Sequence, residues 1–551
     1  MDQLLIDELK KEFSGDIETD EKTLDSHSHD ASIFELKPAV VVFPKNTKDI
    51  EKLVKFVTDN KGKYPSLSLS PRAAGTDMSG GSLTESIMVS FQKYFNETPK
   101  IEGNTAVTQP GVFYRDFEKE TLKHKLLYPP YPSSKDICAM GGIINNNAGG
   151  EKSLQYGKAE DYILEMDVVL SDGNMYTIKP LTESELMKKI EKNDYEGKLY
   201  KKIYTLIDKN YDEIMKAKPN VSKNSAGYYL WNVWDREKKI FDLTKLFVGA
   251  QGTLGIMTQA KVKLVPVKKH AEMLILYVND YKHLAEIVNT LLPYNPESIE
   301  SYDDVTLKLA LKYCADFTKK MGTKNRINTI IHFLPEFMMR ATGKLPKLTI
   351  QAEFTGDDYD EIKKVINEVR EKLKPLKIKS VYAKNETAEI KYWLIRRDSF
   401  GLLRSKIKDM YASPFIDDII VKPEYLPEFL PKFMGILNKY PTIIDTFAGH
   451  VGNGNFHVIP LVKLTDPEQQ KLIPLISEEV FKLVAQYKGS TSGEHNDGMI
   501  RTPYLHIQFE NKILDLFEET KKIFDPEEIF NPGKKVGTKL SYTMSHIRKT
   551  W

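Results

Sequence analysis

The feature that most constrains this chain is the stretch 71–82, Pro-Arg-Ala-Ala-Gly-Thr-Asp-Met-Ser-Gly-Gly-Ser, which directly follows an alternating, strand-like run. Its three glycines lack side chains and can adopt positive φ, so successive backbone N–H groups can converge on an anion. Thr76 and Ser79 add hydroxyl donors. The stretch lacks the Gly-Lys-Ser/Thr ending of a Walker loop and the spacing of a Rossmann fingerprint. It therefore indicates a pyrophosphate cradle, with a purely structural turn as the alternative.

The length, the charge balance and the cysteine count limit the class of protein. A chain of 551 residues predicts roughly three domains. Lys and Arg (79) nearly balance Asp and Glu (77), so the global charge gives no support for nucleic-acid binding. The only cysteines, Cys138 and Cys314, exclude a disulfide framework and an internal iron–sulfur cluster, and we expect a reducing cytoplasm. The N-terminus is acidic and amphipathic, and no run reaches ~18 apolar residues, so we expect neither secretion nor membrane insertion.

Further small-residue stretches follow the first. After a helical lead-in, a strand, a helix and a strand from Pro38 onward deliver the loop at a strand end, where α/β folds bind ligands. Residues 140–150, Met-Gly-Gly-Ile-Ile-Asn-Asn-Asn-Ala-Gly-Gly, follow a proline-rich approach at 128–134. Their small residues allow a planar ligand close to the backbone, although an Asn/Gly turn between strands has the same composition. A third such stretch covers 249–256, Gly-Ala-Gln-Gly-Thr-Leu-Gly-Ile.

Residues 268–440 alternate strand-like and helix-like segments and predict an α+β cap. Within them, 313–347 is rich in Met, Phe and Lys. We interpret that segment as buried filler, or as a contact to a membrane surface or a redox partner.

Three motifs in this order, Pro-Arg-Ala-Ala-Gly-Thr-x-x-x-Gly-Gly, Gly-Gly-x-x-x-x-Asn-Ala-Gly-Gly and Gly-x-x-Gly-Thr-Leu-Gly-Ile, resemble the FAD-binding domain of the vanillyl-alcohol-oxidase superfamily. Within it, the chain is most similar to the FAD-linked glycolate oxidase and D-2-hydroxyacid dehydrogenase group. The resemblance implies an α+β fold: a helical lead-in (1–36), a p-cresol-methylhydroxylase (PCMH)-type FAD-binding domain of two subdomains (37–267), and a ferredoxin-like substrate cap (268–440). A C-terminal segment (441–551) would carry the metal and catalytic motifs and pack back on the FAD domain.

The same resemblance implies the residues that hold FAD. We expect a non-covalent cofactor, because no histidine lies in 71–82 and the nearest, His124, is distant in sequence. The implied FAD-binding residues are Pro71, Arg72, Ala73, Ala74, Gly75, Thr76, Asp77, Ser79, Gly80, Gly81, Pro132, Ser133, Gly141, Gly142, Asn145, Asn147, Ala148, Gly149, Gly252, Gly255, Ile256 and Asn531.

The C-terminal part contains a candidate catalytic constellation. Ala-Gly-His-Val-Gly-Asn-Gly-Asn-Phe-His at 448–457 places two imidazoles around a glycine turn, and Ser-Gly-Glu-His at 492–495 adds a carboxylate and a third imidazole. Two His and one Glu form a recognised open metal site, but the spacing alone also fits histidines of a core or a turn. The resemblance implies a divalent metal, Zn or Mn, held by His450, His457 and Glu494.

Oxidation of a hydroxy acid requires a base for the hydroxyl proton as the C2 hydrogen departs as hydride, and an imidazole neutral near pH 7 suits this role. The resemblance assigns it to His495, which would point differently from Glu494 if the pair lay on a strand. We expect Asn455 to orient the substrate.

The run 393–400, Trp-Leu-Ile-Arg-Arg-Asp-Ser-Phe, resembles the family's Trp-x-x-Arg element. An Arg fork matches a carboxylate, so Arg396 is the candidate for the substrate's acid group, with Arg397 and Arg404 close enough to leave the choice open. Family members that act on D-2-hydroxyglutarate add a Thr and a Lys where this chain has Phe400 and, approximately, Ile416. Tyr131, Gln251 and Asn496 also depart from the family pattern.

We therefore expect FAD-dependent oxidation of a D-2-hydroxy acid (D-lactate, glycolate or a D-2-hydroxyglutarate-like acid) to the 2-oxo acid. Without cluster-forming cysteines, electrons would leave to a separate electron-transfer flavoprotein, iron–sulfur subunit or quinone. A cytoplasmic homodimer, with peripheral contact at the inner face of the membrane as an alternative, completes the expectation. The competing hypotheses are a flavin oxidase of another alcohol and an FAD-binding electron-transfer subunit that no hydroxy acid reduces.

Overall fold

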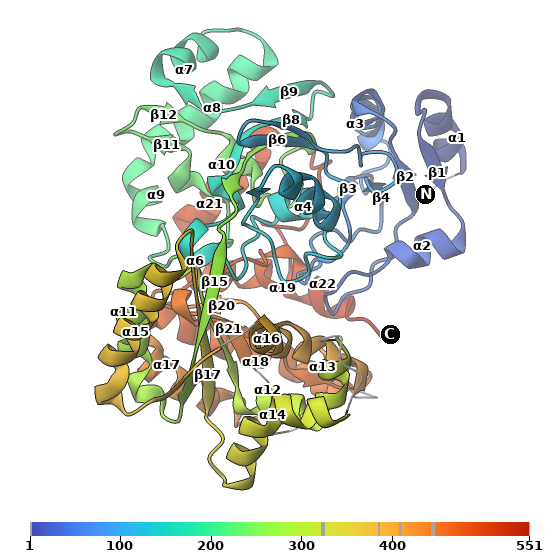
Figure 1. Cartoon of the computed structure of the whole chain (residues 1–551). Helices are drawn as coiled ribbons and strands as arrows, with labels where there is room; N and C mark the ends of the chain where they lie inside the picture. The colour runs from blue at the N-terminus through green and yellow to red at the C-terminus, as the bar shows by residue number, and fades with distance from the viewer. Residues whose placement is uncertain (1–2, 321–325, 384–385, 407–409, 442–446, 550–551) are drawn as a thin grey trace.

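The computed structural model describes residues 3–320, 326–383, 386–406, 410–441 and 447–549. The chain forms two lobes (Figure 1). The upper lobe in this view contains most of the first half of the chain, and the lower lobe is built around one large sheet. Segments from the last hundred residues lie in both lobes.

The first part of the upper lobe is a four-stranded sheet in the order β1-β2-β4-β3: Asp16–Glu18, Val40–Phe43, Ile87–Ser90 and Leu69–Arg72. β2, β4 and β3 run parallel, and helix α3 (Thr47–Lys61) connects β2 to β3. Asn46 caps α3, whose buried residues include Ile50, Leu53 and Val57. The residues that follow β3 are the glycine-rich loop, so the parallel sheet places this loop at a strand end.

The second part of this lobe is a five-stranded antiparallel sheet, β5-β6-β13-β8-β9: Lys100–Glu102, Thr105–Thr108, Ile256–Lys263, Ile163–Val169 and Met175–Ile178. Helices α4 (Tyr114–Lys123), α8 (Tyr195–Lys209) and the C-terminal α21 (Asn511–Phe524) contribute to its core. Phe517 and Phe524 of α21 are fully buried there. The C-terminal segment thus packs into the upper lobe through α21.

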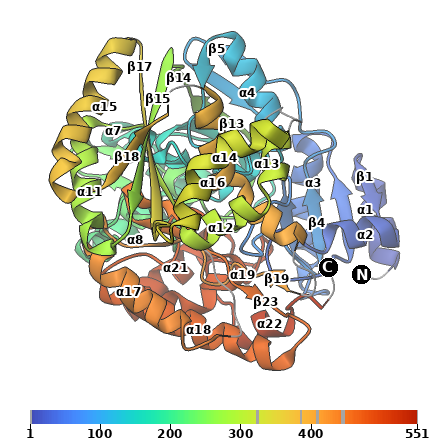
Figure 2. The same ribbon diagram turned by 60° about the horizontal axis from the view of Figure 1, so that its bottom comes forward.

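The lower lobe is a seven-stranded sheet in the order β18-β15-β17-β16-β21-β22-β20. β15 (His270–Val278), β16 (Ser298–Asp303), β17 (Leu348–Gly356) and β18 (Lys379–Tyr382) are antiparallel in the order 4-1-3-2, which is the ferredoxin-like arrangement. Helices α11 (Leu284–Leu291), α15 (Tyr359–Leu373) and α17 (Leu426–Leu437) contribute to the core on one face. Helices α12 (Asp304–Lys312), α14 (Arg326–Ala341) and α16 (Glu386–Lys406) lie on the other face (Figure 2).

Three strands extend this sheet beyond β16: β21 (Phe447–His450), β22 (Asn455–Val458) and β20 (Ile419–Ile420). The sheet therefore crosses residue 440, where the sequence analysis placed a boundary. The turn between β21 and β22 needs Gly454, which has φ +74° and whose added Cβ would lie 1.9 Å from the Val421 carbonyl oxygen. After α18 (Pro467–Gln486), residues 490–497 form a loop rather than a strand, apart from an isolated bridge at Ser490.

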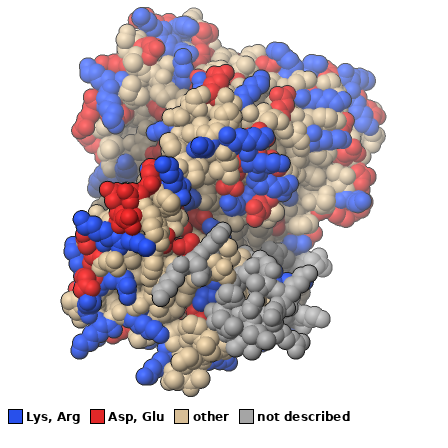
Figure 3. Space-filling view, in the orientation of Figure 1, with Lys and Arg blue, Asp and Glu red and all other residues tan. Residues whose placement is uncertain are grey.

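The C-terminal segment pairs with a segment near the N-terminus. Arg548 N donates to Ile33 O, and Phe34 bridges to Ile547. Acidic and basic side chains intermix over the face in Figure 3. None of the helices in the described part of the chain has the length and apolar character that crossing a bilayer requires.

Candidate active site

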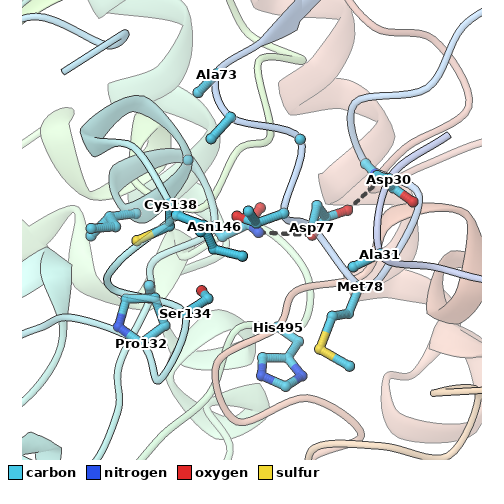
Figure 4. A pocket seen from close by; sticks show the side chains of 18 of the residues that line it. Asp30, Ala31, Ala73, Asp77, Met78, Pro132, Ser134, Cys138, Asn146 and His495 are labelled. Atoms are coloured by element: carbon cyan, nitrogen blue, oxygen red, sulfur yellow. Dashed lines mark hydrogen bonds between the residues drawn. The ribbon is translucent and has the colours of Figure 1, made fainter. Parts of the chain in front are cut away.

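A cavity of about 670 Å³ is lined by residues of both lobes. The upper lobe contributes the loop after β3 and residues 132–149, and the lower lobe contributes α12, α16, β19 (Tyr411–Ala412), β21 and β22. His495 reaches it from the 490–497 loop (Figure 4). Residues as far apart in the sequence as Pro71 and His495 therefore line the same cavity.

The glycine-rich end of the cavity fits an anionic cofactor. Gly75 has φ +68°, and Gly142 faces enough open space that an added Cβ would be 4.0 Å from the nearest atom. Arg72 is 8% exposed and donates from Nη2 to His29 O (2.8 Å), while its Nη1 has no hydrogen-bond partner. A buried guanidinium nitrogen without a partner is costly and indicates a ligand that accepts from it. FAD, with its pyrophosphate, suits this set of donors.

The structure separates the residues expected at FAD into two groups. The following line the cavity: Pro71, Arg72, Ala73, Ala74, Gly75, Thr76, Asp77, Gly81, Pro132, Ser133, Gly141, Gly142, Asn145, Ala148, Gly149 and Gly252. The following do not: Ser79, Gly80, Asn147, Gly255, Ile256 and Asn531.

Those outside the cavity wall have other partners. The Ser79 hydroxyl donates to Asp77 (2.7 Å), and Asn147 Oδ1 accepts from Glu160 N (3.0 Å). Asn531 donates from Nδ2 to the carbonyls of Gly81 and Gln251, both at 2.7 Å, so it ties two cavity-lining loops together.

Sequence reasoning missed Asn146, which lines the cavity and donates to Asp77 Oδ1 (2.8 Å; Figure 4). Three consecutive asparagines carry no signal that separates them. Helix α5 (Met140–Asn145) ends just before Asn146, and this local geometry decides which amide faces the cavity.

The predicted metal ligands converge on one carboxylate oxygen. His450 Nε2 lies 3.1 Å from Glu494 Oε1, and His457 Nε2 lies 3.2 Å from the same oxygen. Each imidazole is oriented by a carboxylate at its other nitrogen: His450 Nδ1 is 2.6 Å from Glu300 Oε1, and His457 Nδ1 is 3.2 Å from Asp417 Oδ1. Carboxylate–histidine pairs of this kind orient ligands in metal sites.

The charges around this cluster leave room for a divalent cation. Glu300, Asp417, Asp418 and Glu494 are buried acids, and Lys223 and Arg396 are the cations paired directly with them. Among the described residues, Asp417 and Asp418 have no direct lysine or arginine ion pair, although the buried Lys158 interacts electrostatically with Asp418 and Glu494. A divalent cation or protonated imidazoles would add positive charge here. The donor set of two imidazoles and a carboxylate therefore fits a divalent metal.

The pKa shifts follow from the same contacts. Burial by itself would lower the pKa of His457, but Asp417 and Glu494 outweigh burial and raise it to about 10. The pKa of His495 is also raised, because Asp417 and Asp418 outweigh its burial. Burial opposes ionisation of Glu494, yet Lys223 and His450 hold its pKa well below the usual range.

His495 is placed as a candidate base. Its Nδ1 lies 2.6 Å from Asp417 Oδ2, and its ring stacks on His457 with centroids 4.9 Å apart. Because Asp417 takes Nδ1, the free nitrogen of a neutral His495 is Nε2, which lies 3.9 Å from Glu494 Oε1. Glu494 and His495 lie on a loop rather than on a strand, and both line the cavity.

Asp418 holds this loop in place. Its Oδ2 accepts from the backbone nitrogens of Glu494 (2.8 Å) and His495 (2.7 Å) and from the Ser492 hydroxyl (2.8 Å). Although Asp418 Oδ1 or Oδ2 falls within 4.8 Å of ligand atoms of His457, Glu494 and His495, its acceptor capacity is used by these donors. We therefore regard it as a positioning residue.

Asn455, expected to orient the substrate, is fully buried and does not line the cavity. Its Nδ2 donates to Asp418 Oδ1 (3.1 Å) and Ile419 O (3.2 Å), and its Oδ1 faces Lys223 Nζ at 3.5 Å. Strand β22 turns the Asn455 side chain into the protein, where its amide group has hydrogen-bond partners, and so it does not face the cavity.

The structure distinguishes two of the three arginine candidates. Arg397 is bidentate on Glu151 and packs over Trp393 at 4.4 Å, so its charge is already balanced. Among the described residues, Arg396 donates only from Nε, to Glu300 Oε2 (3.0 Å), which leaves its terminal nitrogens for a ligand. Both line the cavity, and the side chain of Arg404 lies outside the described residues.

Glu300, Asp417, Asp418 and Lys223 are the charged residues that sequence reasoning did not assign to the site. A signal existed: Asp417 and Asp418 interrupt the apolar run 415–421, and an acid within such a run is buried only with partners.

Gln251 and Asn496, which depart from the family pattern, are both buried. Gln251 Nε2 donates to Ser79 Oγ (3.1 Å), and Asn496 Nδ2 donates to Gly249 O (2.7 Å), so each side chain joins two loops.

Fold and cavity together define a two-domain flavoprotein of the FAD-dependent oxidoreductase class. Residues 38–179 match a family model described as an FAD binding domain, and residues 267–535 match one described as FAD linked oxidases, C-terminal domain. The chain therefore contains both of these domains, which confirms the predicted fold class and FAD as the cofactor.

Two curated relatives support the assignment of these domains. The chain is 27% identical over 529 residues to a D-2-hydroxyglutarate dehydrogenase of Pseudomonas putida (95% of this chain, 50% of that protein). It is 25% identical to the glycolate oxidase subunit GlcD of Bacillus subtilis (92% of this chain, 91% of that protein). The chain thus spans about half the length of the first of these relatives. Among solved structures, 4-ethylphenol oxidase from Gulosibacter chungangensis shares the fold at a TM-score of 0.68 and 16% identity, over 98% of this chain and 99% of that one.

Proposed function

We propose that this protein oxidises a D-2-hydroxy acid to the 2-oxo acid and passes the electrons to a separate acceptor. The observation that carries the proposal is the convergence of Arg396, His457, Glu494 and His495 on the cavity beside the FAD-binding loops, with His450 outside the cavity wall and in contact with Glu494. A 2-hydroxy acid has a carboxylate, a hydroxyl group and a C2 hydrogen, and each has a counterpart here.

Each residue has a distinct task. The terminal nitrogens of Arg396 bind the substrate carboxylate, while Glu300 holds the guanidinium from its Nε side. His495 accepts the hydroxyl proton at Nε2, because Asp417 fixes Nδ1–H. A divalent cation held by His450, His457 and Glu494 would polarise the hydroxyl oxygen. FAD supplies the two-electron acceptor for hydride from C2.

The test is anaerobic. The FAD-loaded protein, with and without added Zn or Mn, is mixed with D- and L-2-hydroxy acids while the flavin band at ~450 nm is followed. We expect bleaching by a D-acid and a loss of bleaching in His495→Ala that leaves FAD bound. A protein that keeps its flavin colour with every hydroxy acid would overturn the proposal and favour an electron-transfer subunit.

A further inference from the structure

The wall of the substrate end of the cavity sets the chemistry of the acid's side chain. Once the FAD-binding loops and the polar cluster are set aside, the remaining lower-lobe residues of the wall are Thr306, Leu309, Ala412, Ala448 and Ile459. Met78 joins them from the end of the glycine-rich loop and points into the same space as His495 (Figure 4). None of these six side chains carries a charge.

Four of them belong to one packed apolar cluster. Ala412 and Ile459, at 5% and 7% exposure, pack with Leu461, and Met78 and Leu309 contact this group. The cluster is held by backbone pairing, because Ala412 of β19 lies opposite Leu461 of β23 (Leu461–Val462). This wall is therefore a fixed apolar surface.

The described cavity wall offers a second carboxylate no spare cation. Its cationic side chains apart from histidine are Arg72, Arg396 and Arg397. Arg72 belongs to the glycine-rich end, Arg396 is assigned to the acid group, and Arg397 is neutralised by Glu151. Asp417 and Glu494 also line this region, so a second carboxylate would meet like charge.

We infer that the substrate is a D-2-hydroxy monocarboxylic acid with an aliphatic side chain, which packs against Met78, Leu309, Ala412 and Ile459. This inference rests on the proposed function and selects a substrate class within it. A dicarboxylic acid of the same length would have to bury its second carboxylate on the apolar wall without a partner, which is strongly unfavourable.

The test uses two five-carbon acids that differ only in the terminal group, D-2-hydroxyvalerate and D-2-hydroxyglutarate. In anaerobic flavin reduction by the FAD-loaded protein, we expect the rate constant divided by the dissociation constant to be at least ~100-fold higher for D-2-hydroxyvalerate. From D-lactate to D-2-hydroxyvalerate, the same ratio should rise about fourfold for each methylene group. Equal or faster reduction by D-2-hydroxyglutarate would overturn the inference and leave the proposed function intact.

A binding measurement separates the two ideas further. We expect 2-oxovalerate to perturb the flavin spectrum at concentrations at least ~10-fold below 2-oxoglutarate, with no turnover needed. If no hydroxy acid reduces the flavin but this preference holds, the proposed function falls while the apolar pocket stands. If 2-oxoglutarate binds as well as 2-oxovalerate, the pocket assignment is wrong.

A variant of the apolar wall should weaken the selectivity for the monocarboxylic acid. Leu309→Arg places a cation on the partly buried wall and should raise the relative rate with D-2-hydroxyglutarate by ~10-fold or more. Val305→Arg adds the same charge to α12 at a position outside the cavity wall and should leave the preference unchanged. Equal effects of the two variants would contradict a direct role for Leu309.

Discussion

At the residue scale, the site depends on how each charged group is shared. Glu300 accepts from Arg396 and also orients His450, so one carboxylate couples the acid-binding group to a candidate metal ligand. Asp417 in the same way contacts both His457 and His495. Removing either acid would therefore disturb two neighbouring side chains at once. A substitution of the side chain proposed to contact the substrate gives a clearer test.

Arg396→Lys tests the carboxylate contact. Lysine keeps the charge but loses the planar fork, and a hydrogen bond to a charged group contributes about 1.5–3 kcal/mol. We expect the dissociation constant of the hydroxy acid to rise about 10- to 100-fold, measured by flavin bleaching. Arg236→Lys, at a surface pair with Asp208, is the matched control and should change nothing. An unaltered dissociation constant in Arg396→Lys would remove Arg396 from the substrate site.

We expect Asp30 to make the affinity for FAD pH-dependent. This carboxyl lines the cavity near Asp77, Arg72 and Lys534, and its Oδ2 has no hydrogen-bond partner. Burial, reinforced by Asp77, raises the pKa of Asp30 to about 7. Below pH 7 the group is neutral with or without FAD. Above pH 7 it is ionised in the free protein and must take up a proton, or repel the pyrophosphate, when FAD binds.

We therefore expect the FAD dissociation constant to be flat from pH 6 to 7 and to rise by up to ~10-fold per unit above pH 7. Flavin fluorescence quenching measures it. In Asp30→Asn the rise should disappear, and its persistence there would assign the effect to another group.

At the element scale, α16 joins the two lobes. Arg397 on this helix binds Glu151, which follows the second glycine-rich stretch and also accepts from the Tyr131 hydroxyl (3.0 Å). Lys152 reaches Glu297 just before β16 in the same region. The helix therefore fixes the position of the cap relative to the FAD-binding loops.

The Glu151–Arg397 pair can be tested by a double-mutant cycle. Arg397→Met leaves Glu151, 7% exposed, without its cation, and should lower the free energy of unfolding by roughly 3 kcal/mol. Adding Glu151→Gln should restore part of this loss, since the buried charge is then gone. Urea unfolding measures both. Lys239→Met breaks an exposed pair with Glu183 and should cost at most about 1 kcal/mol.

At the scale of the whole molecule, the cavity is lined by segments from both lobes and by the 490–497 loop. A ligand that touches all of them stabilises the folded chain by mass action. At a free FAD concentration of 100 times its dissociation constant, the gain is ≈ 2.7 kcal/mol, so the melting temperature of this 551-residue chain should rise by about 2 °C. Calorimetry with riboflavin as the control would show whether the pyrophosphate end is needed for this gain.

The proposed metal also belongs to this scale, because its proposed ligands come from two separate segments of the chain. We expect close to one Zn or Mn per FAD in the purified protein, measured by elemental analysis. Chelation or His450→Ala should slow flavin reduction by about two orders of magnitude while the flavin stays bound. A fully active, metal-free protein would leave protonated imidazoles to add the positive charge at the cluster.

Local sequence patterns determined the order of the elements and the positions of the main motifs in this protein. The glycine-rich stretches, the strand and helix order, and the motifs at 448–457 and 492–495 depend on side-chain size and periodicity, which are readable along the chain. These features indicate the fold class and the FAD-binding loops. They also point to His450, His457, Glu494 and His495, which the fold brings together.

Only the tertiary structure decided which neighbours each group has. It turned Asn455 inward onto Asp418, selected Asn146 over Asn147 at the cavity, and gave Arg397 but not Arg396 a neutralising bidentate partner. It also placed Glu300 and Asp417 behind the imidazoles. Contacts between residues hundreds of positions apart follow from sheet pairing and helix packing, and no local pattern carries that information.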